Sequence, residues 1–117
     1  MSKLNGKRVL VLEDEALVAF MLEDMLGEMN CTVVGPALDV AEGEALARTE
    51  AIDAAILDLN LRDQTCHPVA QALDERGIPY LLASGSDDPD ALPSAKGSLG
   101  KPYHFSDVEM QLSKLFL

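Results

Sequence analysis

The sequence predicts an α/β domain in which helices cover both faces of a parallel sheet. Short apolar runs alternate along the chain with longer segments whose apolar residues recur at helical spacing. Two of the runs, Val9–Leu12 and Ala54–Leu57, contain no polar residue, which is typical of strands buried on both faces. Strands that alternate with helices form a parallel sheet through right-handed crossovers. The carboxyl ends of the strands then share one edge, where such sheets bind ligands.

The first half of the chain is expected to contain two strands and two helices. Apolar runs predict strands over Lys7–Leu12 and Cys31–Gly35, the second stopped by Gly35-Pro36. A helix over Ala16–Met29 is expected, because apolar residues recur at helical spacing: Leu17, Met21, Met25 and Met29, with Phe20 and Leu22 beside them. The methionines are expected to fill the core. Asp39 is a good N-cap for a helix through about Thr49, with a thin apolar face formed by Ala41, Ala45 and Leu46.

The second half is expected to contain three strands and two helices. The strands are predicted over Asp53–Leu59, Ile78–Ala83 and Ser98–Gly100. The helices are predicted over Pro68–Arg76, capped by Thr65 or a neighbour, and over Phe105–Leu117, with an apolar stripe of Val108, Leu112 and Leu115. Between them, Asp87–Gly97 contains two prolines and should form at most a turn or two of helix.

Composition favours one domain over residues 1–117, because 48% of the 117 residues are hydrophobic and no linker divides them. No apolar run is long enough to span a membrane and no signal peptide is recognised, so we expect a cytoplasmic chain. The net charge of −11 argues against direct binding to nucleic acid or an anionic membrane. A cation or a protein is the better partner. Cys31 and Cys66 are expected to be reduced and structural.

Polar residues end every predicted strand except the second. They are Glu13 and Asp14, Asp58, Ser84, and Lys101. Carboxylates about 4–6 Å apart repel one another by a few kcal/mol, so folding alone does not explain this set. A hard divalent cation such as Mg²⁺ would compensate, because it takes oxygen ligands and leaves positions for water or a phosphate oxygen.

On these residues the chain resembles the receiver domains of two-component response regulators, over essentially its whole length. The signal is carried by Glu13-Asp14, Asp58, Ser84-Gly85 and Lys101-Pro102, each at the expected strand end and in the expected order. The resemblance implies a flavodoxin-like, doubly wound sheet with strand order 2-1-3-4-5. It also implies a phosphorelay function, in which an aspartate takes a phosphoryl group from a phosphohistidine on a sensor histidine kinase or a histidine phosphotransfer protein.

Carried onto this chain, the resemblance makes Asp58 the phosphoacceptor. Glu13, Asp14 and Asp58, with the backbone carbonyl of Asn60, would hold Mg²⁺ or Mn²⁺. After transfer, Ser84 and Lys101 would contact phosphoryl oxygens. The resemblance also implies room for the group at Gly85 and a cis bond before Pro102. The chain would catalyse only its own phosphorylation and dephosphorylation, and so would not be an enzyme acting on a separate substrate.

Simpler interpretations stand beside these roles. Asp58 could cap a turn, and Glu15 could serve only the dipole of the following helix. A Mg²⁺-dependent phosphohydrolase is an alternative function, but it needs a second acid two residues after the nucleophile, where the chain has Asn60. A degenerate receiver that binds partners constitutively is a third, and the intact acidic set argues against it.

The chain departs from the family between Ser84 and Lys101, which are only 17 positions apart. Ser98 stands where many members carry an aromatic residue that couples phosphorylation to output. We therefore expect the signal to pass through a loss of mobility in the Ser86–Gly97 loop. No output domain is recognised, so output is expected through an unidentified downstream protein or through competition for phosphoryl groups. A monomer or a weak homodimer is expected.

Overall fold

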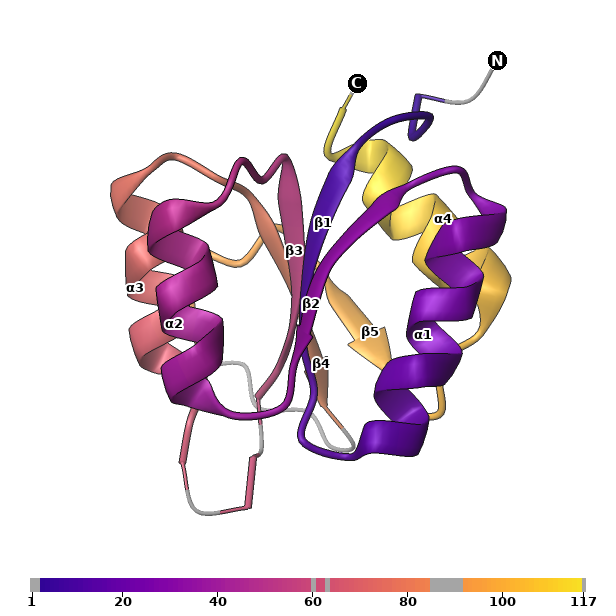
Figure 1. Ribbon diagram of the computed structural model, residues 1–117. Coiled ribbons are helices and arrows are strands. Elements are labelled where there is room, and N and C mark those ends of the chain that lie inside the picture. Colours follow the sequence, from indigo (N-terminus) through magenta and orange to yellow (C-terminus); the bar gives the residue numbers. More distant parts are fainter. Residues whose placement is uncertain (1–2, 60, 63, 85–91, 117) are drawn as a thin grey trace.

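The computed structural model describes residues 3–59, 61–62, 64–84 and 92–116, and for Ser84 the backbone only. Figure 1 shows a central sheet between two layers of helices. In chain order the elements are β1 (Arg8–Leu12), α1 (Ala16–Glu28), β2 (Thr32–Ala37), α2 (Val40–Thr49), β3 (Ala54–Asp58), α3 (His67–Glu75), β4 (Tyr80–Ser84), β5 (Ser98–Gly100) and α4 (Phe105–Lys114). Within the described ranges, no helix is long and apolar enough to cross a membrane.

The sheet is parallel throughout and has the order β2-β1-β3-β4-β5, which confirms the predicted fold and topology. Helices α1 and α4 cover one face, and α2 and α3 cover the other (Figure 1). Successive residues of β3 point to opposite faces, so Ala54 and Ile56 join the core beneath α1 and α4, while Ala55 and Leu57 join the other. This two-sided burial explains the unbroken apolar run.

Strand β2 was predicted to stop at Gly35-Pro36, but it continues to Ala37. The Gly35-Pro36 bond is cis, and Gly35 has a φ of +97°. A Cβ at Gly35 would lie 2.6 Å from the backbone nitrogen of Ala37, so glycine is required there. Proline is tolerated because β2 is an edge strand. The pairing with β1 resumes with a register shift at Leu12 and Ala37.

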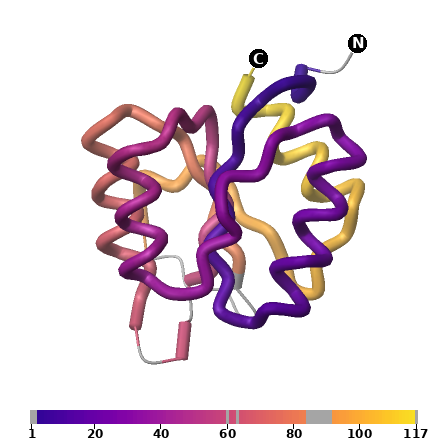
Figure 2. The backbone as a smooth tube through the Cα atoms, viewed as in Figure 1, coloured from indigo at the N-terminus to yellow at the C-terminus, as the bar shows by residue number. Residues whose placement is uncertain are grey.

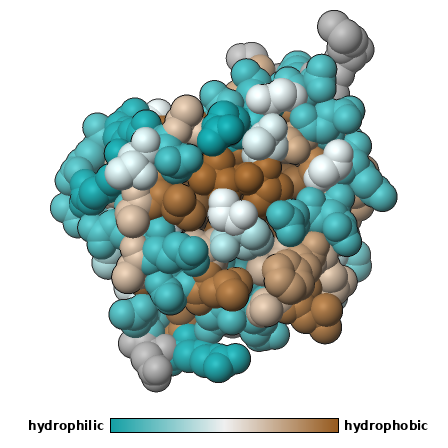
Figure 3. Space-filling view, viewed as in Figure 1, coloured by the Kyte–Doolittle hydropathy of each residue, from teal (hydrophilic) through white to brown (hydrophobic). Residues whose placement is uncertain are grey.

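The predicted core face of α1 is confirmed at Met29 and, partly buried, at Met25, but it is wrong at Leu17 and Met21. The helix buries Ala19, Leu22 and Leu26, whereas Leu17, Phe20 and Met21 are half or more exposed. These exposed residues define an apolar patch on the first half of α1, where brown and tan side chains gather at the lower right of Figure 3. The predicted face of α2 is wrong at Ala41 and Ala45, which are exposed, whereas Leu46 packs partly buried against the core. The buried residues of α2 are Val40, Gly43 and Ala47.

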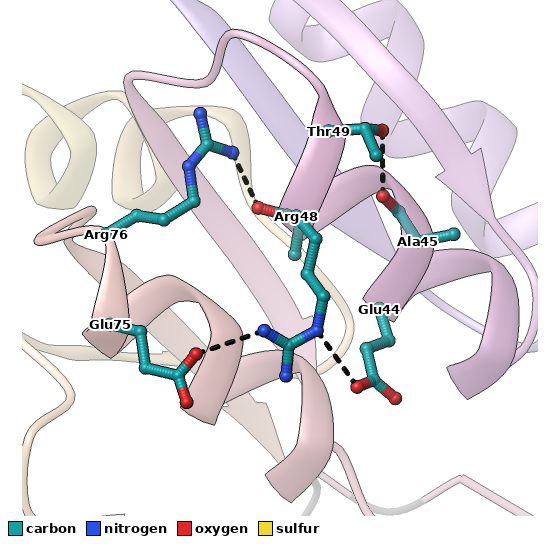
Figure 4. A network of polar contacts seen from close by, with 7 residues as sticks. Glu44, Ala45, Arg48, Thr49, Glu75 and Arg76 are labelled. Atoms are coloured by element: carbon teal, nitrogen blue, oxygen red, sulfur yellow. Dashed lines mark hydrogen bonds and ion pairs between the residues drawn. The ribbon is translucent and has the colours of Figure 1, made fainter.

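Polar contacts fasten α2 to α3. Figure 4 shows Arg48 between Glu44, at 3.2 Å on its own helix, and Glu75 of α3, at 3.0 Å. Arg76 follows α3 and donates to the carbonyl oxygens of Ala47 and Glu50 at 2.6 and 2.8 Å, which satisfies acceptors at the end of α2. The ion pairs are exposed and contribute little stability, so apolar packing holds this layer.

The predicted caps of the two helices had different outcomes. Asp39 caps α2 by accepting a hydrogen bond from the backbone nitrogen of Glu42 at 2.8 Å, as expected. Helix α3 instead begins after Cys66 without a side-chain cap, and the Thr65 hydroxyl lies 2.7 Å from Nδ1 of His67.

The segment before β5 is held against β4 by hydrogen bonds. The expectation of little helix over 87–97 falls partly outside the described residues, and residues 92–97 contain a turn and no helix. The backbone nitrogen of Lys96 donates to the carbonyl of Tyr80 at 3.0 Å. The Tyr80 hydroxyl lies 2.9 Å from Oγ of Ser94, which donates to Asp74 at 3.0 Å. Tyr80 therefore links this segment to α3.

Truncation of Leu81 in β4 should test the core beneath α1 and α4. Leu81 is fully buried there, so Leu81→Ala should lower the free energy of unfolding by about 2–5 kcal/mol. The matched control is Leu17→Ala, since Leu17 is 73% exposed and its loss should change stability by no more than about 0.5 kcal/mol. Urea unfolding measures both, and equal effects would contradict the described packing.

Candidate functional site

The structure places the side chain of Asp58 at the end of β3, in the middle of the sheet. The residue is 2% exposed, and its backbone pairs with Ala83 of β4. Strand β1 lies on the other side of β3 and ends at Leu12, so Glu13 and Asp14 emerge beside Asp58. The buried apolar residues of both strands fix these positions, because a register shift of one residue would move every side chain of the strand to the opposite face of the sheet.

Lys101 reaches into this group from the segment after β5. Its ammonium nitrogen lies 2.9 Å from Oε2 of Glu13 and 3.0 Å from Oδ2 of Asp58. Burial acts to lower the pKa of Lys101, but hydrogen bonds to Glu13 and Asp58 outweigh it, so the pKa is raised. Lys101 is therefore charged at neutral pH and shared by the two carboxylates. The bond between Lys101 and Pro102 is cis, as expected.

Glu13 is the most enclosed member of the group, with no exposed surface. Burial raises the pKa of Glu13, the charge of Asp58 raises it further, and contact with Lys101 opposes both. One oxygen, Oε1, accepts a hydrogen bond from the backbone nitrogen of Glu15 at 3.2 Å. The other, Oε2, is buried without an aligned hydrogen-bond donor among the described residues, so its compensation there is the ion pair with Lys101.

Asp14 lies nearer the surface and faces the segment after β3. Its Oδ2 accepts a hydrogen bond from the backbone nitrogen of Arg62 at 3.0 Å, and the Nε of Arg62 lies 3.7 Å from the same oxygen. The side chain of Arg62 is 80% exposed, so its ion pair is weak. A small pocket borders this contact, with Leu38, Asp39 and Gln64 among its other lining residues.

Oxygen atoms of Glu13, Asp14 and Asp58 lie within 4.8 Å of one another. These are hard donors, and one ammonium group offsets three carboxylates, so the donor set and its charge fit Mg²⁺ or Mn²⁺. The predicted fourth donor, the carbonyl of Asn60, lies outside the described residues. The backbone of Ser84 ends β4 at the same edge, while its side chain and Gly85 also fall outside them.

Tyr103 and Arg62 contact this site and were absent from the sequence prediction. Tyr103 is 7% exposed, and its hydroxyl is buried without an aligned hydrogen-bond partner in the described part of the chain. Burial raises the pKa of Tyr103, the charges of Glu13 and then Asp58 raise it further, and a hydrogen-bond contact with Glu13 acts in the same direction. The position of Tyr103, two residues after Lys101, could have identified it as a neighbour of the site. No sequence pattern distinguishes Arg62 from the other residues of its loop.

A pocket of about 350 Å³ opens beside Lys101 on the α1 side of the sheet. Its walls are Glu15, Val18 and Met21 from the start of α1, with Lys101, Pro102 and Tyr103 opposite. Met21 also belongs to the apolar patch of α1. The site is therefore continuous with an exposed apolar surface.

Comparison with known proteins bears on the family and the fold of this chain. No family model matches the chain. The transcriptional regulatory protein PdtaR of Mycobacterium tuberculosis, in two strains, is 30% identical over 108 residues, which cover 87% of this chain and 53% of the relative. The chain thus spans about half the length of the curated relatives that it matches.

Solved structures match along the whole domain. SdrG from Sphingomonas melonis Fr1 is 38% identical with a TM-score of 0.81, over 96% of this chain and 98% of that one. The receiver domain of the putative response regulator NarL from Mycobacterium tuberculosis is 25% identical with a TM-score of 0.77, over 94% and 98%. A CheY-like receiver domain protein from Methanospirillum hungatei JF-1 has a TM-score of 0.84 at 21% identity, over 95% and 94%, and supports the fold.

The raised pKa of Glu13 predicts how its contribution to stability depends on pH. The folded chain keeps this proton to a higher pH than the unfolded chain, so the contribution is present near the ordinary value of 4.5 and is lost as pH rises through the folded pKa. Glu13→Gln cannot ionise, so its stability relative to wild type should increase as pH rises above the ordinary value of 4.5.

Urea unfolding without divalent cations at several pH values measures this difference. Glu28→Gln, at the end of α1, controls for removing one negative charge from an exposed position. A difference between Glu13→Gln and wild type that does not change with pH would contradict the proposed origin of the shift.

Proposed function

Because the chain belongs to the receiver domains of response regulators, we propose that Asp58 accepts a phosphoryl group from a phosphohistidine of a partner protein. The observation that carries this proposal is the shared contact of Lys101 with Glu13 and Asp58. It joins a buried carboxylate to a second acid and a cation at the edge of the sheet where ligands bind. Folding alone gives no reason to bury such a group.

In the transfer step, an oxygen of ionised Asp58 forms a bond to phosphorus while the phosphorus–nitrogen bond of the phosphohistidine breaks. The bonding electrons remain on the imidazole, which can take up a proton, and Asp58 becomes an acyl phosphate. Lys101 already lies 3.0 Å from Oδ2 of Asp58, so a small movement would bring its ammonium group to a phosphoryl oxygen. Attack by water on the phosphorus later restores the carboxylate.

The acidic residues of the site would hold the metal cofactor. Glu13, Asp14 and Asp58 supply carboxylate oxygens, and the predicted carbonyl of Asn60 would complete the protein ligands. Mg²⁺ or Mn²⁺ bound there would offset negative charge on the phosphoryl oxygens. Before it binds, Lys101 and the backbone nitrogen of Arg62 compensate the same acids. Ser84 keeps its predicted role as a donor to a phosphoryl oxygen.

The partner that donates the phosphoryl group is proposed to be a sensor histidine kinase or a histidine phosphotransfer protein. It must approach Asp58 from the carboxyl edge of the sheet, where the apolar patch of α1 borders the pocket beside Lys101. Exposed Leu17 and Phe20 can be buried by such a partner. Nearby acids, including Glu15, would favour a basic rim on it.

The proposed chemistry is limited to the chain itself, which catalyses its own phosphorylation and dephosphorylation. A phosphohydrolase would need an acid at position 60, where the sequence has Asn60. A constitutive binding module would not need three clustered carboxylates, two of them in contact with a lysine. Output is proposed to pass to a downstream protein, and reduced mobility of the Ser86–Gly97 loop on phosphorylation stays a prediction.

The phosphoacceptor role predicts a single covalent modification. With Mg²⁺ and a small acyl or amido phosphate as donor, wild type should gain one phosphoryl group in intact mass, and Asp58→Asn should gain none. The matched control is Asp53→Asn, which changes the acid just before β3. Asp53 accepts a hydrogen bond from the backbone nitrogen of Arg8 at 2.8 Å, far from the site, so this variant should be modified as wild type is.

Removal of divalent cations with a chelator should slow the modification by at least about tenfold, because charge on the phosphoryl oxygens would then be uncompensated. Modification of Asp58→Asn at the wild-type rate would contradict the assigned acceptor. Steady hydrolysis of many donor molecules without a phosphorylated chain would favour the phosphohydrolase.

A further inference from the structure

Asp14 differs from the other two acids of the site in the cation that compensates it. Lys101 contacts Glu13 and Asp58. Asp14 is contacted instead by Arg62, from the segment after β3. The backbone nitrogen of Arg62 donates to Oδ2 of Asp14 at 3.0 Å, and Nε of its guanidinium lies 3.7 Å from the same oxygen. One residue therefore contacts this carboxylate twice, through its backbone and through its side chain.

The backbone contact leaves Asp14 able to bind a divalent cation. A carboxylate has two oxygens, so Oδ1 can bind the cation while Oδ2 keeps its hydrogen bond. Hydrogen bonds of this kind fix the orientation of a carboxylate that binds a metal. Any substitution of Arg62 other than proline keeps the backbone N–H, so the side chain can be removed without removing this donor. The two contacts can therefore be separated by experiment.

The guanidinium contact acts against the cation. Arg62 carries its positive charge at every physiological pH, so it attracts the Asp14 carboxylate and repels a divalent cation bound to it. The Arg62 side chain is 80% exposed, so water can solvate its charge when the contact breaks, and the ion pair itself contributes little stability. The guanidinium is therefore held weakly enough to be displaced, but it lies close enough to lower the affinity for the cation.

We propose that the guanidinium of Arg62 competes with the divalent cation for Asp14 and leaves the carboxylate when the cation binds. This inference rests on the proposed function, which places Mg²⁺ or Mn²⁺ on the three acids of the site. Arg62 is a positioning residue that acts through Asp14 and touches neither the cation nor the phosphoryl group. It determines how much Mg²⁺ the site needs before Asp58 can accept a phosphoryl group.

The test compares Arg62→Ala with Arg48→Ala, because both variants remove one exposed arginine and change the net charge equally. Arg48 lies near the end of α2, at the edge of the sheet opposite to the site, and pairs with Glu44 and Glu75. Arg62→Lys keeps a positive charge at the site. Calorimetric titration with magnesium chloride at low ionic strength measures the affinity of each chain. Since the Arg62 side chain is 80% exposed, Arg62→Ala should fold as wild type does.

At low ionic strength, Arg62→Ala should bind Mg²⁺ about two- to fivefold more tightly than wild type, the factor for one exposed ion pair. Arg62→Lys and Arg48→Ala should each stay within about 1.5-fold of wild type. In about 0.5 M sodium chloride, the gain in Arg62→Ala should fall below about 1.5-fold, because salt screens exposed charges. At low ionic strength, half-maximal phosphorylation of Asp58 should need about two- to fivefold less Mg²⁺ in Arg62→Ala.

Equal or weaker binding of Mg²⁺ by Arg62→Ala would overturn this inference and leave the proposed function standing. A gain that is as large in Arg48→Ala, or that persists in high salt, would also overturn it, because net charge or a change in packing would then be the cause. A wild-type chain that neither binds Mg²⁺ nor gains a phosphoryl group would overturn the proposed function and this inference together.

Discussion

The ammonium group of Lys101, shared between Glu13 and Asp58, is the contact on which the site depends. Two buried carboxylates at the centre of the sheet would be costly without a cation, and a single missing partner would leave an uncompensated charge. The parallel sheet meets this constraint because β1 and β3 deliver the acids to one edge while the segment after β5 returns the lysine to it. The three side chains therefore compensate one another's charge at this edge of the sheet.

The two faces of the sheet differ in how completely they are closed. Arg48 and Arg76 fasten α2 to α3, and the Tyr80 hydroxyl extends this fixed layer to the segment before β5. On the other face, α1 buries one side against the sheet and presents the apolar patch on another. Figure 2 traces the described chain from one end of the molecule back to the same end, away from the carboxyl ends of the strands.

Sequence reasoning succeeded where burial was two-sided and failed where it was ambiguous. The runs in β1 and β3 are apolar at every position, so they identified the central strands and the acids that follow them. Helix α1 is apolar almost all round, so spacing could not separate buried Leu22 from exposed Met21. Gly43 lies on the buried face of α2, where a Cβ would approach Leu12 at 3.1 Å. A hydrophobicity pattern does not predict such a close approach. Pairing of a hydroxyl such as that of Tyr103 depends on three-dimensional placement.

The departure at Ser98 bears on how a change at Asp58 could reach the surface. Ser98 begins β5 and is exposed. It has no aromatic ring whose position could change when Lys101 moves. Lys101 instead forms one wall of the pocket beside α1 together with Tyr103, and Met21 of the apolar patch forms another. Any displacement of Lys101 toward Asp58 must alter that wall. Lys101 and the pocket therefore connect the site physically to the exposed apolar patch of α1.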